Sequence, residues 1–307
     1  MALPIFTRPA WLSPTIIGVL CGTAAALSWA AGFVAARHAV QIGLTPADLA
    51  FHRFFWAGLV LLPAIWRAGF ADLGGVGWGR GFFIFLLAGP TQGLLSAAGF
   101  VLAPLGHGAV IQPGTAALVG LILATLILHE PLLLRRAIGA AAILSGLVLL
   151  GAEAVTTIGS HGLGGDLFFL AAGISWATFG TVLRLWNLRA QRAALAIAAL
   201  SLVVYAPLHA IFIGFQHMVD VGLWENVLQI MVQGGLAGPL GVHLFARAVV
   251  LLGAGRAAAF PAVVPPATLV IGALTLGEVP TAIQLAGLAV VVVGFRLALQ
   301  QPDRPPA

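Results

Sequence analysis

The sequence predicts an all-α membrane protein of ten transmembrane helices, arranged as two inverted five-helix repeats. Three observations lead to this prediction: the composition, the spacing of the apolar segments and the similarity of the two halves. Of 307 residues, 61% are hydrophobic and only 7% are charged, whereas a soluble domain carries about 25% charged residues. So few charges cannot cover a water-soluble surface.

The apolar residues fall into ten blocks whose lengths suit a membrane crossing, since a helix needs about 20 apolar residues to cross a hydrocarbon core of about 30 Å. The blocks predict spans at residues 15–36, 47–66, 81–103, 108–128, 137–152, 166–185, 193–215, 223–249, 256–276 and 281–299. The first block is too long for the core of a signal peptide, so we expect it to remain in the mature protein.

The basic residues predict the orientation of the spans. The chain contains no lysine, so all 14 basic residues are arginines. With the N-terminus inside, only Arg37 and Arg53 fall outside, and because cytoplasmic loops collect basic residues, both termini are expected in the cytoplasm. The arginines on the predicted inner side are Arg8, Arg67, Arg80, Arg135, Arg136, Arg184, Arg189, Arg192, Arg247, Arg256, Arg296 and Arg304.

The sequence also argues against several partners and chemistries. A net charge of +5 does not indicate nucleic-acid binding, because that partner requires basic residues clustered on one face. The single cysteine, Cys21, cannot form a disulfide within the chain and lacks the partners of a cysteine metal site. His129 and Glu130 lack the second histidine of a zinc-protease motif. We therefore expect no catalytic set, no metal and no cofactor.

An internal repeat is the main sequence signal. At a separation of 147 residues, Gly18, Ser28, Trp29 and Arg37 recur as Gly165, Ser175, Trp176 and Arg184. At 149, residues 87–90 recur as 236–239, and at 148, Pro113, Glu130, Gly139 and Gly146 recur as Pro261, Glu278, Gly287 and Gly294. The second and seventh spans match poorly, and His52 and Arg53 have no counterpart.

The two repeats, 15–152 and 163–299, each contain five predicted spans. Because five is odd, the second copy enters the membrane from the opposite side, and the repeat is inverted. Inverted repeats occur in secondary transporters, whose two copies rock around a site near the middle of the bilayer. We therefore expect a carrier that moves a small-molecule substrate by alternating access.

Several segments resemble the EamA-type members of the drug/metabolite transporter superfamily. The first span carries Ser28, Trp29 and Gly32, and Pro46 and Arg53 enter the second span as the family pattern has it. The second half opens similarly, and each half closes with a proline-bearing span, a glutamate and a glycine-spaced span. The resemblance covers nearly the whole chain. It implies ten helices, cytoplasmic termini, a central cavity lined by spans one, three, four, six, eight and nine, and the transport of a metabolite, often outward.

Proline inside a span frees a backbone carbonyl, which lipid tolerates only where protein or water satisfies it. Such helix breaks favour positions along a cavity, and their recurrence in both halves supports that interpretation. An ordinary packing kink is the alternative, since Gly and Pro are common in membrane helices. The predicted breaks are Gly89, Pro90, Pro113, Gly238, Pro239, Pro261, Pro265 and Pro266.

Two tryptophans and two glutamines are further candidates for contact with substrate. Trp29 and Trp176 occupy equivalent positions, too deep for an interfacial belt, so they either stack on a substrate or pack between spans. Gln92 and Gln112 lie inside spans three and four, where each either binds substrate or bonds to a neighbouring helix. The tryptophans and the scarcity of buried charge favour an amino acid or a similar amphipathic solute.

Pro239, His243 and Arg247 are spaced by four and share one face of the eighth span. Ionisable groups inside a membrane are functional candidates, so His243 is predicted to bind a carboxylate or to carry a coupling proton. The alternative is a histidine bonded to a neighbouring helix. Arg247 either steers anions at the cavity mouth or is a snorkelling anchor.

Glu130 and Glu278 are predicted on opposite membrane faces, each just before a helix, where a carboxylate favours the positive end of the helix dipole. We expect them to be structural, and Arg37 and Arg184 to be anchors.

The rival functions are an intramembrane enzyme and a sensor or assembly subunit. The sequence lacks the paired carboxylates, metal ligands or nucleophile that such an enzyme would need. The alanine-rich, lysine-free composition suggests a bacterial inner membrane. Glycines spaced by four allow a monomer or a homodimer.

Overall fold

The computed structural model describes residues 13–158, 160–253, 257 and 260–299, and within these ranges it is helical without strands. The first half contains α1 (Pro14–Gln41), α2 (Pro46–Ala68), α3 (Trp78–Ala88), α4 (Pro90–Leu102), α5 (Leu105–Leu126), α6 (Leu134–Glu153) and η1 (Ala154–Ile158). The second contains α7 (Ser160–Leu185), α8 (Ala190–Leu200), η2 (Ser201–Tyr205), α9 (Ala206–Phe212), α10 (Gln216–Val221), α11 (Leu223–Gln229), η3 (Ile230–Leu240), α12 (Gly241–Leu252), η4 (Phe260–Val263), α14 (Val264–Thr275) and α15 (Ala282–Leu299).

The all-helical membrane fold predicted from composition is confirmed. Eight of the described helical stretches are long and apolar enough to cross a membrane, and two shorter apolar helices, Phe260–Thr275 and Ala282–Leu297, follow them. The eight stretches coincide with the first eight predicted spans, whereas the last two helices fall short of that length. The predicted start of the ninth span, Arg256, lies outside the described residues.

The chain interrupts its third and eighth stretches at the same repeated sequence. α3 ends at Ala88 and α4 begins at Pro90, because Gly89 has φ −93° and ψ −147°, outside the helical region. Its counterpart Gly238 has φ −85° and ψ −110° inside η3, immediately before Pro239. A proline cannot donate a backbone hydrogen bond, so a bend before it leaves one fewer donor to satisfy.

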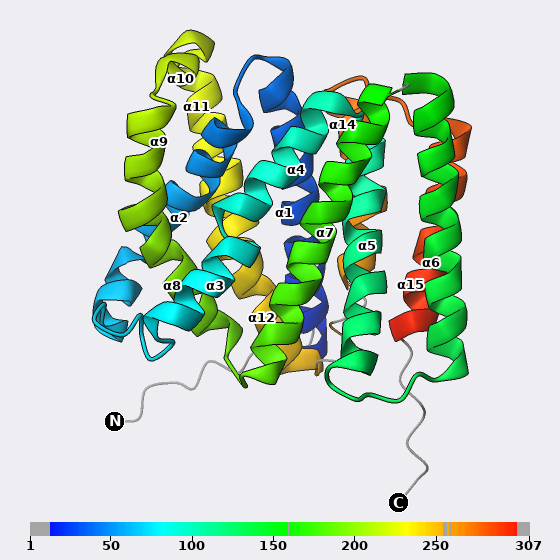
Figure 1. Cartoon of the computed structure of the whole chain (residues 1–307), viewed down its shortest axis with the longest axis horizontal. Helices are drawn as coiled ribbons and strands as arrows, with labels where there is room; N and C mark the ends of the chain where they lie inside the picture. The colour runs from blue at the N-terminus through cyan, green and yellow to red at the C-terminus, as the bar shows by residue number, and fades with distance from the viewer. Residues whose placement is uncertain (1–12, 159, 254–256, 258–259, 300–307) are drawn as a thin grey trace, which may run out of the picture.

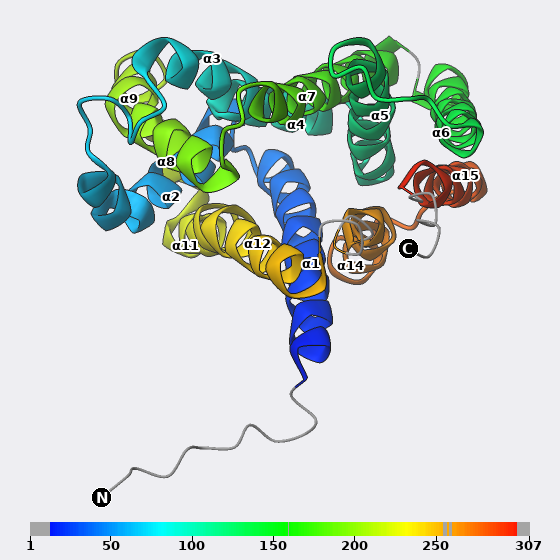
Figure 2. The ribbon, with the colours of Figure 1, turned by 90° about the horizontal axis from the view of Figure 1, so that it is seen from below.

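The two halves pack across each other rather than side by side. α1 contacts α12 and α14 of the second half, and α7 contacts α4 and α5 of the first half. α1 and α7 run in opposite directions (Figure 1), and the view from one end places α1 between α12 and α14 (Figure 2). Corresponding helices of the two halves therefore have corresponding partners.

Glycines explain why α6 and α15 lie so close. A Cβ built on Gly146 of α6 would lie 2.9 Å from the Gly287 carbonyl oxygen of α15. In the counterpart contact, a Cβ on Gly294 would lie 2.7 Å from the Gly139 carbonyl oxygen. Small residues let membrane helices approach to backbone contact, and here the same contact is made from both sides.

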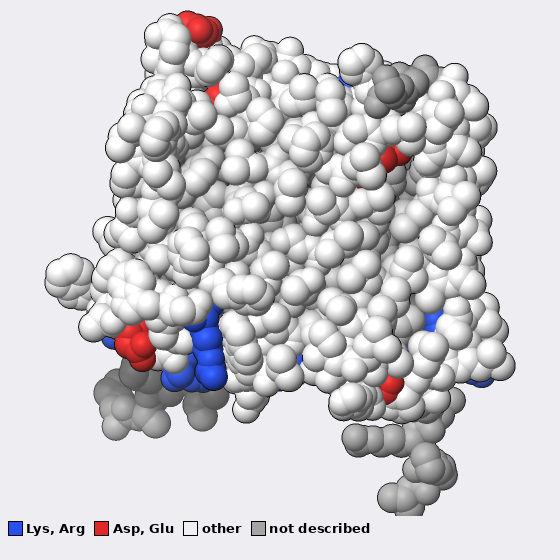
Figure 3. All heavy atoms as spheres, in the orientation of Figure 1, with Lys and Arg blue, Asp and Glu red and all other residues white. Residues whose placement is uncertain are grey.

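Charged residues gather at the two ends of the bundle, and the face in Figure 3 is almost uncharged between them. We call the end where α1 begins and α15 ends the arginine-rich end. Its described arginines are Arg67, Arg80, Arg135, Arg136, Arg184, Arg189, Arg192, Arg247 and Arg296. Arg8, Arg256 and Arg304 lie outside the described residues.

The opposite end, which we call the histidine–acid end, has a different composition. Only Arg37 and Arg53 lie towards it among the described arginines, and its titratable groups are mostly histidines and carboxylates. These are His38, Asp48, His52, His107, Glu153, His161, Asp166, His209, His217, Asp220, Glu225 and Glu278. The two ends therefore differ in the chemistry of their contacts as well as in net charge.

Candidate functional site: polar contacts between the two halves

An ion pair between the halves joins the helices at the histidine–acid end. Arg37 of α1 donates from Nε to Glu278 at 2.6 Å, and from a terminal nitrogen to the carbonyl oxygen of Phe100 at 2.5 Å. Glu278 also accepts from Gln41 at 2.8 Å and from the Leu105 backbone N–H at 2.9 Å. The two charged side chains are only 18% and 22% exposed. This network ties α1 and the start of α5 to the segment after α14.

The counterpart residues form a second ion pair at the arginine-rich end. Arg184 of α7 donates to Glu130, which also accepts from Arg136 at 3.4 Å. By the repeat, Arg184 corresponds to Arg37 and Glu130 to Glu278. Arg184 is 54% exposed and Glu130 32%, so this pair is more open and has fewer partners than its counterpart.

Each pair therefore joins an arginine of one half to a glutamate of the other. Glu130 and Glu278 lie at opposite ends, as expected from the sequence. Arg37 and Arg184 are not isolated anchors, because each has a carboxylate partner across the boundary between the halves. The sequence held a signal for this pairing: Arg37 and Glu278 were both predicted on the outer side, and Arg184 and Glu130 on the inner side.

Three histidine–carboxylate pairs, two of them buried, add to the contacts at the histidine–acid end. His209 Nε2 lies 3.0 Å from Asp48 Oδ1, and both side chains are fully buried. His107 Nδ1 lies 2.8 Å from Asp166 Oδ1, which joins α5 to α7. The third pair, in which His38 Nε2 lies 3.0 Å from Glu225 Oε2, is partly exposed. Buried charges are stabilised by partners of this kind, and sequence reasoning missed all three pairs because their members are distant in the chain.

The predicted glutamines lie where α4 and α5 approach each other. Gln112 of α5 accepts at Oε1 from the Ser96 hydroxyl of α4 at 2.7 Å. Gln92 is 7% exposed and lies one turn before Ser96 on α4, so the two share a face. Thr115, one turn after Gln112, has a buried hydroxyl without a hydrogen-bond partner. The structure thus brings both glutamines to one interface within the first half.

The equivalent tryptophans have different surroundings. Trp29 of α1 packs against Phe245 of α12 with 5.4 Å between ring centroids. Its Nε1 lies 2.9 Å from the position that a Cβ on Gly241 would take. Trp176 of α7 is 47% exposed, and the aromatic ring that it contacts is Phe179 of its own helix, at 5.5 Å. The repeat thus preserves the residue but not its contacts.

His243 and Arg247 do not join Trp29. Both side chains are exposed on α12, whereas Gly241 and Phe245 of that helix contact Trp29. Residues two apart on a helix do not share a face. His243 and Arg247 therefore lie away from the surface of α12 that packs on Trp29.

The remaining predicted breaks take several forms. α5 continues as one helix across Pro113, so this proline removes a backbone hydrogen bond without ending the helix. Pro261 lies in the 3₁₀ turn η4, and Pro265 and Pro266 lie in the first turn of α14. Only the repeated Gly-Pro pairs at 89–90 and 238–239 produce a non-helical residue within a membrane-length stretch.

Arg53 lies inside the bundle, a position that sequence reasoning did not anticipate. A terminal nitrogen of Arg53 donates to Gln233 Oε1 of η3 at 3.1 Å, and Gln233 donates to the Gly32 carbonyl oxygen of α1 at 2.7 Å. Arg53 was assigned to the outer side only from the alternation of spans. Two sequence signals had set it apart: its place in the family pattern and the absence of a counterpart in the second repeat.

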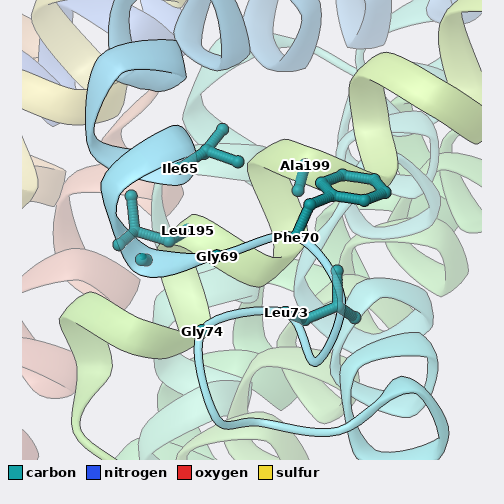
Figure 4. A pocket seen from close by; sticks show the side chains of 8 residues that line it. Ile65, Gly69, Phe70, Leu73, Gly74, Leu195 and Ala199 are labelled. Atoms are coloured by element: carbon teal, nitrogen blue, oxygen red, sulfur yellow. The ribbon is translucent and has the colours of Figure 1, made fainter.

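A small pocket lies apart from all of these residues, between the segment that follows α2 and helix α8 (Figure 4). Its lining is Ile65, Ala68, Gly69, Phe70, Leu73, Gly74, Leu195 and Ala199. The lining contains no polar side chain and none of the predicted site residues. Among the described residues, no group of three or more His, Cys, Asp or Glu could hold a metal ion.

These observations define a polytopic helical membrane protein whose two halves exchange polar contacts at both ends. The model of the EamA-like transporter family matches the chain twice, over residues 16–152 and 163–300, so the chain belongs to that family. A solved structure titled only as the crystal structure of a protein is similar, with a TM-score of 0.57 and 16% identity over 93% of this chain and 96% of that chain. At this identity the likeness shows the fold alone. No curated protein matches.

Proposed function

We propose that the chain is a secondary transporter that moves a small amphipathic metabolite, preferably an amino acid and preferably outward, by alternating access. Family membership supports transport of a small solute across a membrane rather than catalysis. The exchanged ion pairs Arg37–Glu278 and Arg184–Glu130 are the observation that carries the proposal. A structural anchor would not need an equivalent interhalf contact at each end.

The difference between the two pairs supports a cycle of closing and opening. The Arg37–Glu278 network is mostly buried and has several partners, as expected of an end that is closed. The Arg184–Glu130 pair is more exposed. If the halves rock, the arginine-rich end closes around Arg184 while the network around Arg37 opens, because related contacts are available at both ends.

The proposed architecture has ten crossings in two inverted repeats, 15–152 and 163–299, with both termini in the cytoplasm of a bacterium and the chain in its inner membrane. Opposite running directions of α1 and α7 support the inversion. The two shorter helices, Phe260–Thr275 and Ala282–Leu297, are proposed to complete the count. The arginine-rich end is proposed to face the cytoplasm, since basic residues collect there.

Substrate is proposed to bind between the halves near Trp29, Gln92, Gln112 and Trp176, with the Gly-Pro breaks as hinges or lining. Trp29 contributes an aromatic surface at the boundary of α1 and α12. Gln92 and Gln112 contribute amide groups inside the bundle, where a polar group favours a ligand that satisfies it. His243 is proposed to carry a coupling proton and Arg247 to steer anions at the cavity mouth, because both side chains are exposed.

Counterflow into proteoliposomes tests this function. Vesicles containing the full chain are loaded with one unlabelled amino acid or related metabolite from a panel, and uptake of its labelled form is followed. We expect wild-type flux for at least one amphipathic solute. The Arg37→Gln variant is expected to lose on the order of 10-fold in rate, since a hydrogen bond to a charged group stabilises by about 1.5–3 kcal/mol.

The matched control is Arg135→Gln. Arg135 is exposed at the arginine-rich end, and Arg136 preserves a positive charge in the same segment, so flux is expected to stay near wild type. Absence of flux across the whole panel, in protein that remains folded and monodisperse, contradicts the transport proposal.

A further inference from the structure

Arg53 is a cation within a membrane-length helix that has no acidic partner. It lies in the second turn of α2, whose stretch Pro46–Ala68 is long and apolar enough to cross a membrane. Arg37, Arg136 and Arg184 each pair with a glutamate. Across residues 13–158, 160–253, 257 and 260–299, neither Asp nor Glu pairs with Arg53, whose one hydrogen-bond partner is the neutral Gln233.

Gln233 holds the guanidinium in place. Both polar atoms of its amide group form hydrogen bonds: Oε1 accepts from Arg53 at 3.1 Å, and Nε2 donates to the Gly32 carbonyl oxygen at 2.7 Å. Gln233 is only 3% exposed. The position of the Arg53 head group is therefore fixed relative to α1 and η3 without neutralising its charge.

Part of the guanidinium remains available. An arginine has five N–H donors, and the bond to Gln233 uses one of its terminal nitrogens. Arg53 as a whole is partly exposed, and none of its nitrogens is among the fully buried polar atoms that lack a partner. The unbonded nitrogens are therefore not completely enclosed by protein atoms, and a ligand has a route of approach to them.

Two tryptophans lie within one helical turn of this site. Trp56 follows Arg53 by three residues on the same face of α2, and its Nε1 is buried without a hydrogen-bond partner. A Cβ on Gly234, the residue after Gln233, would lie 2.6 Å from Trp56 Cβ, so Trp56 faces η3. Trp29 precedes Gly32 by three residues on α1. Two aromatic side chains thus lie one helical turn from the residues that form and hold the cation.

The second repeat shows that the fold does not require these polar residues. No arginine or glutamine stands at the equivalent positions: a separation of 147 residues places Leu200 at the position of Arg53, and a separation of 149 places Ile84 at the position of Gln233. Leu200 and Ile84 are 1% and 0% exposed and belong to one hydrophobic cluster. The same helices of the other half therefore pack through apolar side chains, and the polar pair serves a purpose other than packing.

We infer that Arg53, oriented by Gln233, binds the carboxylate of the transported solute, whose apolar body lies against Trp29 or Trp56. This inference rests on the proposed transport function and names the substrate class of that site: a monocarboxylate with an apolar or aromatic part. A planar guanidinium matches a carboxylate, and a buried charge is stabilised by an opposite one. A single cation matches one negative charge better than a phosphate dianion.

Matched acid and amide probes test the site directly. The full-length chain is purified in detergent, and its melting temperature is measured with phenylalanine, leucine, phenylacetate or benzoate, and with the corresponding amides. We expect at least one acid to raise the melting temperature and its amide to raise it less. The dissociation constant of that acid is then measured by equilibrium dialysis.

The Arg53→Gln variant is expected to weaken binding of the acid on the order of 10- to 100-fold and to change amide binding little, as expected when a charge-assisted hydrogen bond is lost. Arg53→Lys retains the charge but not the planar fork, so an intermediate loss is expected. Gln233→Leu is expected to weaken binding of the acid several-fold. Arg135→Gln serves as the control and is expected to bind like wild type.

The inference is overturned if no acid stabilises the wild type, if amides bind as tightly as acids, or if Arg53→Gln keeps the wild-type affinity. If Arg53→Gln does not fold, the Arg53→Lys variant is used in its place. Equal losses of binding affinity for the acid and for its amide then overturn the carboxylate site. Flux of amides alone in proteoliposomes would uphold transport and overturn this site. Acids that bind through Arg53 but never cross would uphold the site and overturn transport.

Discussion

Asp48 shows how a carboxylate is accommodated inside the bundle. It accepts from the backbone N–H and the hydroxyl of Thr45, at 2.9 and 2.6 Å, and lies 3.0 Å from His209 Nε2. The bond from the Thr45 N–H, together with the bond that the Asp48 N–H donates to the Thr45 hydroxyl at 3.2 Å, forms the capping box that begins α2. The contact with His209 ties α2 to α9. One side chain therefore stabilises both a helix start and a contact between distant segments.

We predict that Asp48→Ala lowers the stability of the protein by about 2–4 kcal/mol, because it removes the carboxylate half of the capping box and leaves His209 buried without its partner. The measurement is thermal unfolding in detergent, followed by tryptophan fluorescence. Asp220→Ala is the matched control, since Asp220 is exposed and has a contact only with Gln216. Equal melting temperatures for the two variants would refute the prediction.

Individual polar residues were the hardest features to predict from the sequence. Trp29, Gln92 and Gln112 were identified because aromatic and amide side chains inside apolar spans are conspicuous, and the structure places them within the bundle. The contact made by Arg53 was not predicted, because helix periodicity does not show which neighbour a long side chain reaches. Its contact with Gln233 depends on the packing of α2 against η3.

At the scale of elements, the α6–α15 contact depends on glycine. Gly146 leaves no room for a side chain, since its Cβ would lie 2.6 Å from Val291 Cγ2 and 2.9 Å from the Gly287 carbonyl oxygen. Gly151 lies on the same helix and faces open space. The two glycines therefore differ in what surrounds them but share the intrinsic helix propensity of glycine.

We predict opposite effects for the same substitution at these positions. Gly146→Ala is expected to destabilise the protein by about 1–3 kcal/mol, because the added methyl group forces the helices apart. Gly151→Ala is expected to be neutral or to stabilise by up to about 1 kcal/mol, because alanine favours the helix. The melting temperatures of both variants test this prediction. Equal destabilisation by the two substitutions would show that the close contact between α6 and α15 is not the cause.

The elements themselves were largely predictable. Hydropathy located the eight long stretches because each must present apolar surface over the bilayer thickness. The repeated Gly-Pro pairs at 89–90 and 238–239 indicated interruptions, and the structure has a non-helical glycine at each. The segments at Ala154–Ile158 and Ser201–Tyr205 adopt π-helical turns, which no periodicity in an apolar run reveals.

The whole molecule is organised by contacts between its halves, and these predict how a single residue biases the conformation. Arg37→Ala removes the centre of the network at the histidine–acid end. We expect the population to shift towards a state in which that end is open, because the variant loses contacts made only in the closed state.

Cysteine labelling measures this shift. In a Cys21→Ser background, Val34→Cys places a thiol one turn before Arg37 at a position that is 6% exposed in the hydrophobic cluster. Its reaction rate with a water-soluble maleimide is expected to rise several-fold when Arg37→Ala is added, and to stay constant when Arg135→Ala is added instead. If Arg37→Ala leaves the maleimide reaction rate unchanged, the network around Arg37 does not contribute to closing the histidine–acid end.

The side of each terminus tests the number of crossings. The described ends of α1 and α15 lie at the same end of the bundle (Figure 1). We predict that tags fused to the two termini are reached by impermeant reagents from the same side of the membrane, the cytoplasmic side. Tags on opposite sides would require an odd number of crossings and would rule out the paired halves.

The glycine contact between α6 and α15 has one more consequence. Because Gly146 meets the Gly287 carbonyl oxygen in the way that Gly294 meets the Gly139 carbonyl oxygen, the two helices present equivalent surfaces to each other. A half-length polypeptide inserted in both orientations would already possess this surface. Two such molecules in opposite orientations could associate as an antiparallel pair through it. Joining the two halves in one chain raises their effective concentration, which strengthens an association that the shared surface already allows.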